Sequence, residues 1–144
     1  MRLKDLQPWK IALALRMWAL MLSVKLALLR HPLPKVVDDL IQPPKQLRNP
    51  RREPRQLSAI NNRVFRIGSY RPRCLIRSLV HLRLLRAQGD PAVLVIGLPR
   101  GVATTDAHAW VELNGVVVGP PPGRAGHQEF VRYPRPAAQQ PVSP

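Results

Sequence analysis

Apolar positions divide the chain into a helical first half and a second half of mixed pattern. Residues 6–30 are rich in Leu, Ala and Met and are followed by prolines, which predicts a long helix. Shorter helices are predicted at residues 36–41 and 57–67, on either side of a basic, Pro-rich connection. The clearest helix is residues 74–88, where apolar side chains cover most of the circumference, so we expect it to be largely buried.

Three strands are predicted after that helix. Residues 92–98 are almost continuously apolar, as in a central strand. Residues 107–113 and 116–118 are joined by Asn114-Gly115, a strong tight-turn signal that predicts a hairpin. After the prolines that follow we expect a tail with few docking residues: Phe130, Val131 and Tyr133. The elements together predict an α+β fold, in which the last helix packs on a small antiparallel sheet.

The length of 144 residues suits one compact domain. Its 17 prolines gather in two clusters, which should be loops, extended segments or tails. We expect a helical, basic, Pro-rich N-terminal part at residues 1–70, which packs on or flanks a core at residues 71–135. Residues 136–144 are expected to be a disordered tail.

A formal net charge of +15 attracts polyanions such as nucleic acid, an anionic membrane face or an acidic protein. Aromatic residues are only 5% of the chain and no nucleic-acid motif is present, so no specific nucleic-acid contact is expected. The apolar stretch at residues 11–24 includes Arg16 and is shorter than the roughly 20 residues that span a bilayer. We predict a cytoplasmic protein, and contact of its basic N-terminal part with an anionic surface is the alternative.

Cys74 is the single cysteine, which excludes an internal disulfide and suits a reducing compartment. It begins the predicted 74–88 helix, where unpaired backbone N–H groups and the helix dipole favour a thiolate. Positive charge from Arg71, Arg73 and Arg77 acts in the same direction. The simpler interpretation is that one cysteine in an apolar helix is a small buried hydrophobe.

A thiolate nucleophile needs a base, and four histidines are candidates. His81 lies two turns after Cys74 on the same helix, about 10 Å away, too far for a direct hydrogen bond. His108 starts a predicted strand, and strand alternation places it on one face with Trp110 and Glu112. One cysteine and no close pair of histidines leave no set of zinc ligands, so neither a metal nor a cofactor is expected. The other two histidines lie at a helix end and in the Pro/Gly-rich tail: His31 and His127.

Two motifs resemble a known family. They are Arg73-Cys74-Leu75-Ile76-Arg77-Ser78-Leu79 and Ala107-His108-Ala109-Trp110-Val111-Glu112, with Leu84-Leu85, Gly89, Pro91-Ala92, Val95-Ile96-Gly97 and Asn114-Gly115 between and after them. In order and spacing they are similar to the leader peptidases of lasso-peptide biosynthesis, which belong to the transglutaminase-like cysteine-protease superfamily. The resemblance covers about a third of the chain and implies a transglutaminase/papain-like core with a nucleophile-bearing helix.

The resemblance implies a Cys–His–Asp mechanism that cuts the leader from a ribosomally made precursor peptide. Cys74 takes the place of the nucleophile and His108 that of the base. The residues before Cys74 lack the strand alternation of a winged-helix domain that binds the leader. The resemblance therefore implies the split form of the peptidase, which works with a separate leader-binding protein and an ATP-dependent lasso cyclase.

The third residue of the triad departs from the family pattern. Where the family has an Asp beyond the hairpin, this chain has Pro120, which has neither a carboxylate nor a backbone N–H. Asp106, on the same strand face as His108, or a backbone carbonyl could orient the imidazole instead. Glu112 lies about 13 Å from His108 along an extended strand and is expected to be a surface or salt-bridge residue. A non-catalytic scaffold in the same biosynthetic complex is the alternative function.

Overall fold

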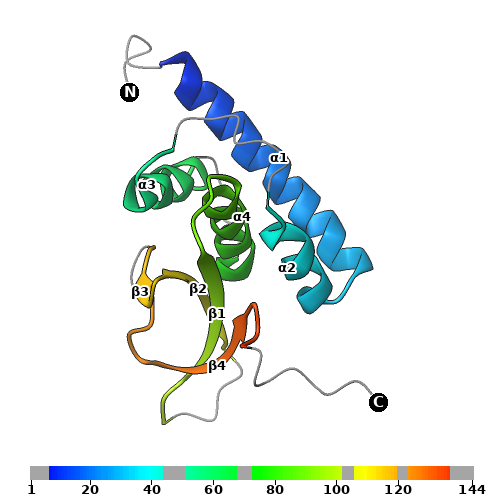
Figure 1. Cartoon of the computed structure of the whole chain (residues 1–144), viewed down its shortest axis with the longest axis vertical. Coiled ribbons are helices and arrows are strands. Elements are labelled where there is room, and N and C mark those ends of the chain that lie inside the picture. Colours follow the sequence, from blue (N-terminus) through cyan, green and yellow to red (C-terminus); the bar gives the residue numbers. More distant parts are fainter. Residues whose placement is uncertain (1–6, 44–50, 68–72, 102–105, 120–122, 137–144) are drawn as a thin grey trace.

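The computed structural model describes residues 7–43, 51–67, 73–101, 106–119 and 123–136. These residues contain four helices followed by four strands (Figure 1). The position of Pro120, Arg71 beside the predicted nucleophile, and the predicted tail after residue 136 lie outside the described residues.

The four predicted helices are confirmed, with ends that differ by a few residues. α1 spans Pro8–Arg30 and α2 spans Leu33–Ile41, and each has a proline in its first turn, where the missing N–H costs nothing. α3 spans Pro54–Val64, and the Glu53 side chain caps it by accepting two backbone N–H groups. α4 spans Cys74–Ala87 and is followed by a glycine with positive φ, as its sequence predicts.

One antiparallel sheet has the strand order β3-β2-β1-β4: β1 (Ala92–Pro99), β2 (His108–Leu113), β3 (Val116–Val117) and β4 (His127–Tyr133). β1 lies inside the sheet, as its continuous apolar run predicts. The predicted hairpin of β2 and β3 is confirmed, because Asn114 and Gly115 both have positive φ, at 52° and 78°. Two consecutive positive φ angles are what a type I′ turn requires.

The expectation of a C-terminal tail is wrong for residues 127–133, which form β4 and pair with β1. Of the three expected docking residues, Tyr133 is buried, Val131 is half-buried and Phe130 is 71% exposed. A register shift opposite Ile96 and Gly97 interrupts the alternation of β4. This bulge explains why an alternating strand pattern is missing from the sequence.

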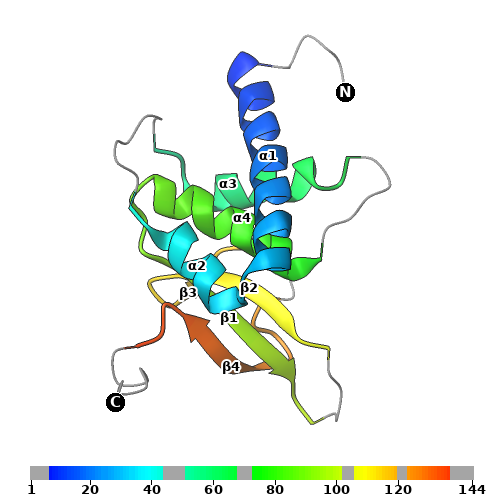
Figure 2. The same ribbon diagram turned by 90° about the vertical axis from the view of Figure 1, so that its right-hand side faces the viewer.

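The helices lie on one side of the sheet (Figures 1 and 2). α4 packs directly on β2 and β1, and the other three helices pack around α4. The predicted burial of α4 is confirmed, since Leu79, Val80 and Leu82 are fully buried. One hydrophobic core joins all four helices to the sheet and includes Met17, Val37, Leu57, Leu85, Leu94 and Val111.

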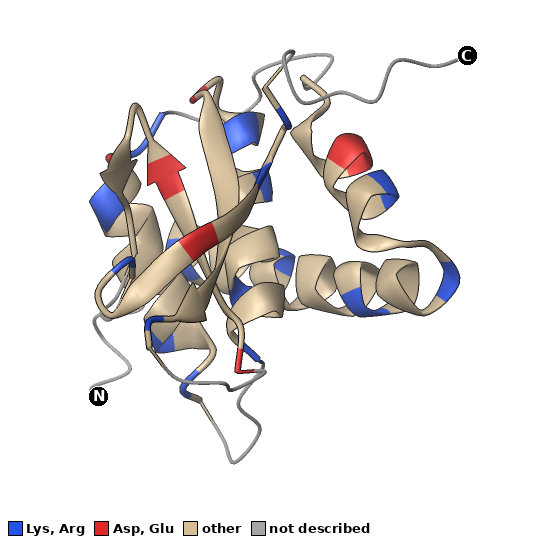
Figure 3. Cartoon of the chain, turned by 90° about the horizontal axis from the view of Figure 1, so that it is seen from below, with Lys and Arg blue, Asp and Glu red and all other residues tan. Residues whose placement is uncertain are grey.

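α1 is apolar on two sides. Its inner side puts Met17, Met21 and Val24 into the core, whereas several large apolar side chains remain on its outer side. In the described part of the chain, α1 is the helix whose length and composition would suffice to cross a membrane, with a mean hydropathy of 1.8. Of that apolar window, 17% is buried within the protein. Basic residues greatly outnumber acidic ones over the helices and loops (Figure 3).

Candidate active site

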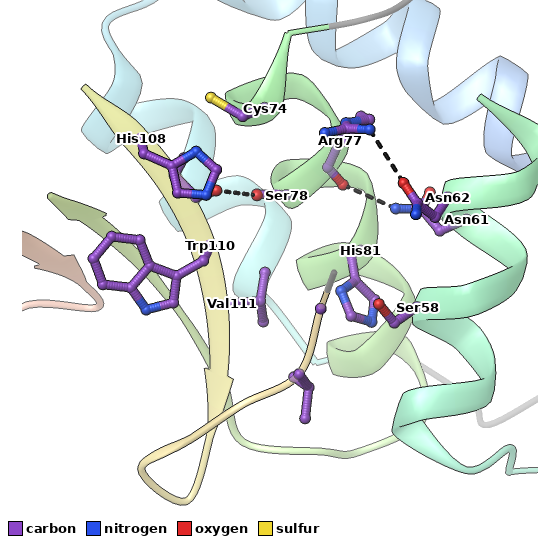
Figure 4. Close-up of a pocket in the computed structure, with 13 residues that line it drawn as sticks. Ser58, Asn61, Asn62, Cys74, Arg77, Ser78, His81, His108, Trp110 and Val111 are labelled. Atoms are coloured by element: carbon purple, nitrogen blue, oxygen red, sulfur yellow. Dashed lines mark hydrogen bonds between the residues drawn. The ribbon is translucent and has the colours of Figure 1, made fainter. Parts of the chain in front are cut away.

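Cys74 and His108 line one pocket between α3, α4 and the start of β2 (Figure 4). The pocket has a volume of about 70 Å³, which is room for a small chemical group and not for a large ligand. Polar side chains from α3 and α4 form one wall, and β2 forms the other. The residues predicted as nucleophile and base, which are 34 positions apart, therefore share one cavity.

Cys74 is the first residue of α4 and is half-buried. The first N–H groups of an α-helix have no partner within the helix. Arg73, the N-cap residue, makes no side-chain hydrogen bond to them. Unpaired N–H groups at the start of a helix favour a negative charge beside them.

A hydrogen bond fixes α4 against β2 close to both residues. Ser78, one turn after Cys74, donates its hydroxyl to the backbone carbonyl of Ala109 over 3.0 Å. Ala109 directly follows His108 in the chain. The bond therefore ties the nucleophile-bearing helix to the strand that carries the base (Figure 4).

Two asparagines fix α3 against α4 on the opposite wall. The side-chain amide of Asn61 donates to the backbone carbonyl of Arg77 over 3.2 Å. The Arg77 guanidinium in turn donates to Oδ1 of Asn62 over 3.1 Å. A fixed positive charge therefore lies in the pocket wall (Figure 4).

His108 lies in a cluster of three rings with Trp110 and His127. Its ring centroid lies 6.1 Å from that of Trp110 with an interplanar angle of 25°, and 5.1 Å from that of His127. Partial burial, reinforced by the positive charges of His127 and Arg77, lowers the pKa of His108 below its ordinary value of 6.5. The imidazole is therefore mostly neutral at pH 7, which is the form that can accept a proton from a thiol.

Glu112 holds the indole of Trp110, the ring that lies beside His108. It is fully buried, so the expected surface position is wrong and the expected salt bridge is confirmed. It accepts hydrogen bonds from the Trp110 indole at 2.9 Å and from Arg124 at 2.8 Å, and pairs with Arg132 at 3.2 Å. These partners satisfy a carboxylate that would otherwise be costly to bury.

Gly97 makes room for the Trp110 ring. A Cβ at this position would lie 2.6 Å from the ring, closer than side chains approach one another. The glycine lies in β1 opposite His108 in the strand register. In the sequence, Gly97 only interrupts an apolar strand. In the structure, it leaves the space that the Trp110 ring beside His108 occupies.

The Pro/Gly-rich sequence around His127 predicts a tail, but the structure brings this residue next to His108. It is the first residue of β4 and its Nδ1 lies 2.9 Å from the carbonyl oxygen of Ala125. The pairing of β4 with β1, which the sequence does not reveal, is what carries it there. No local motif could have linked the two histidines.

The group that orients His108 stays a prediction. Asp106 is an exposed residue two positions before His108, ahead of the start of β2. Pro120 lies outside the described residues, but its neighbour Gly119 lines the pocket.

The pocket has a second histidine at its floor. His81 is buried, and the loss of solvation lowers its pKa to about 4, against a weaker opposing hydrogen bond to the Pro54 carbonyl. Its Nε2 and Oδ1 of Asn61 are buried acceptors without a hydrogen-bond partner in the described part of the chain. A group bound at this floor therefore has to donate hydrogen bonds. The sequence places His81 on the same side of the helix as Cys74 but gives no sign of the cavity.

The described residues hold no cluster of three His, Cys, Asp or Glu side chains that could bind a metal ion. The groups that line the pocket include the thiol of Cys74, the imidazoles of His81 and His108, and the guanidinium of Arg77.

A match to a protein-family model shows which family the chain belongs to. The model described as the transglutaminase-like superfamily matches residues 12–133. The chain belongs to the transglutaminase-like superfamily. No curated protein and no solved structure matches the chain.

The superfamily match begins within α1, covers the other three helices and extends to the end of β4. The four-stranded antiparallel sheet under α4 agrees with a transglutaminase-like core, as the sequence predicts. The transglutaminase-like superfamily includes cysteine peptidases, in which a thiol and an imidazole act together. In this member the thiol of Cys74 and the imidazole of His108 belong to residues that line one pocket.

Proposed function

We propose that this transglutaminase-like protein is a cysteine peptidase that removes the leader from a ribosomally synthesised lasso-peptide precursor. The observation that carries the proposal is the placement of Cys74 and His108 on one pocket at the start of α4. The motifs around these two residues, which resemble those of lasso leader peptidases, supply the substrate class. The proposed partners are a separate leader-binding protein and a lasso cyclase.

In the proposed reaction, neutral His108 accepts the proton of the Cys74 thiol, and the sulfur attacks the carbonyl carbon of the scissile peptide bond. The N–H groups at the start of α4 stabilise the oxyanion of the tetrahedral intermediate. His108 then returns the proton to the leaving amine, and the C–N bond breaks to leave a thioester on Cys74. His108 next takes a proton from water, whose oxygen attacks the thioester carbonyl. The C–S bond breaks, the leader leaves with a C-terminal carboxyl group, and His108 returns its proton to the Cys74 sulfur.

A catalytically degenerate scaffold in the same biosynthetic complex is the second candidate. The observation that favours it is Pro120, which stands where the resembled family has its Asp. Without an Asp at that position, the orientation of His108 depends on other groups: Asp106, a backbone carbonyl, or the neighbouring rings of Trp110 and His127.

Mass spectrometry of the precursor incubated with this chain and the leader-binding protein tests the proposal. We expect cleavage by the wild-type chain and none by Cys74→Ala, with both proteins folded by circular dichroism. Ser23→Ala, a change at an exposed position of α1, is the matched control and should cleave like the wild type. Equal cleavage by Cys74→Ala would exclude a thiol peptidase. No cleavage by the folded wild type with its partner bound would favour the scaffold.

A further inference from the structure

The outer side of α1 carries a narrow line of large aliphatic residues. Its five members are between 43% and 83% exposed: Ile11, Leu15, Leu22, Leu26 and Leu29. At 3.6 residues per turn they fall within an arc of about 60°. Leu15, Leu22 and Leu29 are seven positions apart, which is the spacing of a seam between two paired helices. We call these five residues the outer seam.

The outer seam is separate from the packing that holds α1 on the protein. That packing uses Met17, Met21 and Val24, which are nearly or fully buried. A surface helix normally has one apolar stripe, directed to the core. A second stripe on the opposite side therefore calls for a partner outside the chain.

The charges of α1 indicate the kind of partner. The helix carries four basic residues and no acidic one: Lys10, Arg16, Lys25 and Arg30. Two copies of α1 in contact would place like charges along their seam, which opposes self-association. The same charges would also attract an anionic membrane, but a membrane sets no seven-residue spacing on an apolar face, whereas a paired helix does. The spacing and the charge together favour one acidic helix.

We propose that the outer seam binds a partner protein through an amphipathic helix whose apolar line is flanked by Asp or Glu. The leucines of the seam interlock with the apolar line of the partner helix, and the basic residues on either side of the seam, Arg16, Lys25 and Arg30, pair with its carboxylates. No residue of the outer seam lines the pocket of Cys74, and the docking does not depend on the proposed peptidase activity.

A synthetic four-heptad peptide with Leu at both seam positions and Glu at the flanking positions is the probe. Mutual repulsion of its glutamates hinders the peptide from pairing with itself. Fluorescence anisotropy of the labelled peptide with the full chain should show saturable binding that weakens with added salt. The same peptide with Lys in place of Glu should bind at least about 10-fold more weakly.

Leu22→Glu, at the middle of the seam, should weaken binding of the Glu peptide at least about 10-fold. Phe130→Glu is the matched control, since Phe130 is an equally large exposed residue on β4, and should bind like the wild type. Circular dichroism of both variants checks that they fold.

Absence of binding, equal binding of the Lys peptide, or binding that survives Leu22→Glu would overturn the proposal. Sedimentation of the free chain and flotation with phosphatidylglycerol vesicles complete the test. A dimer or a vesicle-bound form that Leu22→Glu abolishes would assign the seam to a second copy or to a membrane instead, and would also overturn it.

Discussion

His108 and His81 line the same pocket and show how position alone separates two identical side chains. His108 is partly exposed at the mouth, beside Cys74, and its pKa is lowered by partial burial and by nearby positive charge. His81 is buried at the floor and has a pKa of about 4. At pH 7 both rings are neutral, but His108 lies nearer to Cys74 than His81 does (Figure 4). The pocket thus has a mouth suited to proton transfer and a floor suited to hydrogen bonding.

The largest expected effect is that of His108→Ala on peptide cleavage. Loss of a general base typically costs 10²–10⁴-fold in rate, and we expect a decrease of about 10³-fold in kcat/KM. His31→Ala, a change at an exposed histidine at the end of α1, is the matched control and should be within about twofold of wild type. Single-turnover cleavage followed by mass spectrometry measures both. A His108→Ala rate close to that of the wild type would show that His108 is not the general base.

The second effect is the dependence of stability on pH that His81 introduces. Its pKa of about 4 in the folded chain lies below the ordinary value of 6.5, so between these values the unfolded chain binds a proton that the folded chain does not. The contribution of His81 is therefore fully present above pH 6.5 and is lost as the pH falls toward 4. The loss of unfolding free energy is about 3 kcal/mol at most.

Urea unfolding at pH 7 and pH 4.5 measures this loss. His81→Gln should lose less stability between the two pH values than the wild type, whereas His31→Gln should behave like the wild type. The same pH dependence in all three proteins would show that His81 titrates normally.

A smaller effect is expected from the support behind His108. Glu112→Gln removes the charge of a fully buried carboxylate that pairs with Arg124 and Arg132, and should lower the unfolding free energy by about 2 kcal/mol. Glu129→Gln removes an exposed partner of Arg132 and should cost about 0.5 kcal/mol. Urea unfolding of both variants checks the difference. Equal losses of unfolding free energy would mean that the buried ion pairs of Glu112 stabilise the fold no more than the exposed pair of Glu129 does.

The smallest expected effect concerns His127. Its positive charge lowers the pKa of His108, so His127→Gln should raise that pKa. Cleavage activity should then be lost at a higher pH as the solution is acidified, with little change at pH 8. A pH profile of kcat/KM compares the variant with the wild type. An unchanged acid limb would show that the charge of His127 does not reach His108.

Much of the fold could be predicted from local patterns. The apolar coverage of α4, the prolines at the helix starts and the Asn114-Gly115 turn each act within a few residues. β4 could not be predicted, because its partner strand is distant in sequence and a bulge removes its alternation.

The site shows the same division between local and distant information. Cys74 is marked by its place at a helix start, and His108 by its place at a strand start. His127 and the buried state of Glu112 depend on β4 and on Arg132, which local patterns do not connect to β2. The cavity above His81 depends on how α3 packs on α4, and spacing along one helix does not reveal it.

The activation of Cys74 by His108 is tested most directly by alkylation with iodoacetamide. Cys74 is the single cysteine, so the rate of labelling reports its reactivity without a precursor or a partner protein. We predict that wild-type Cys74 is labelled at least about 10-fold faster than that of His108→Ala at pH 7. The two rates should converge at alkaline pH, where both proteins hold the thiolate. Identical rates for the two proteins at every pH would contradict a functional Cys74–His108 pair.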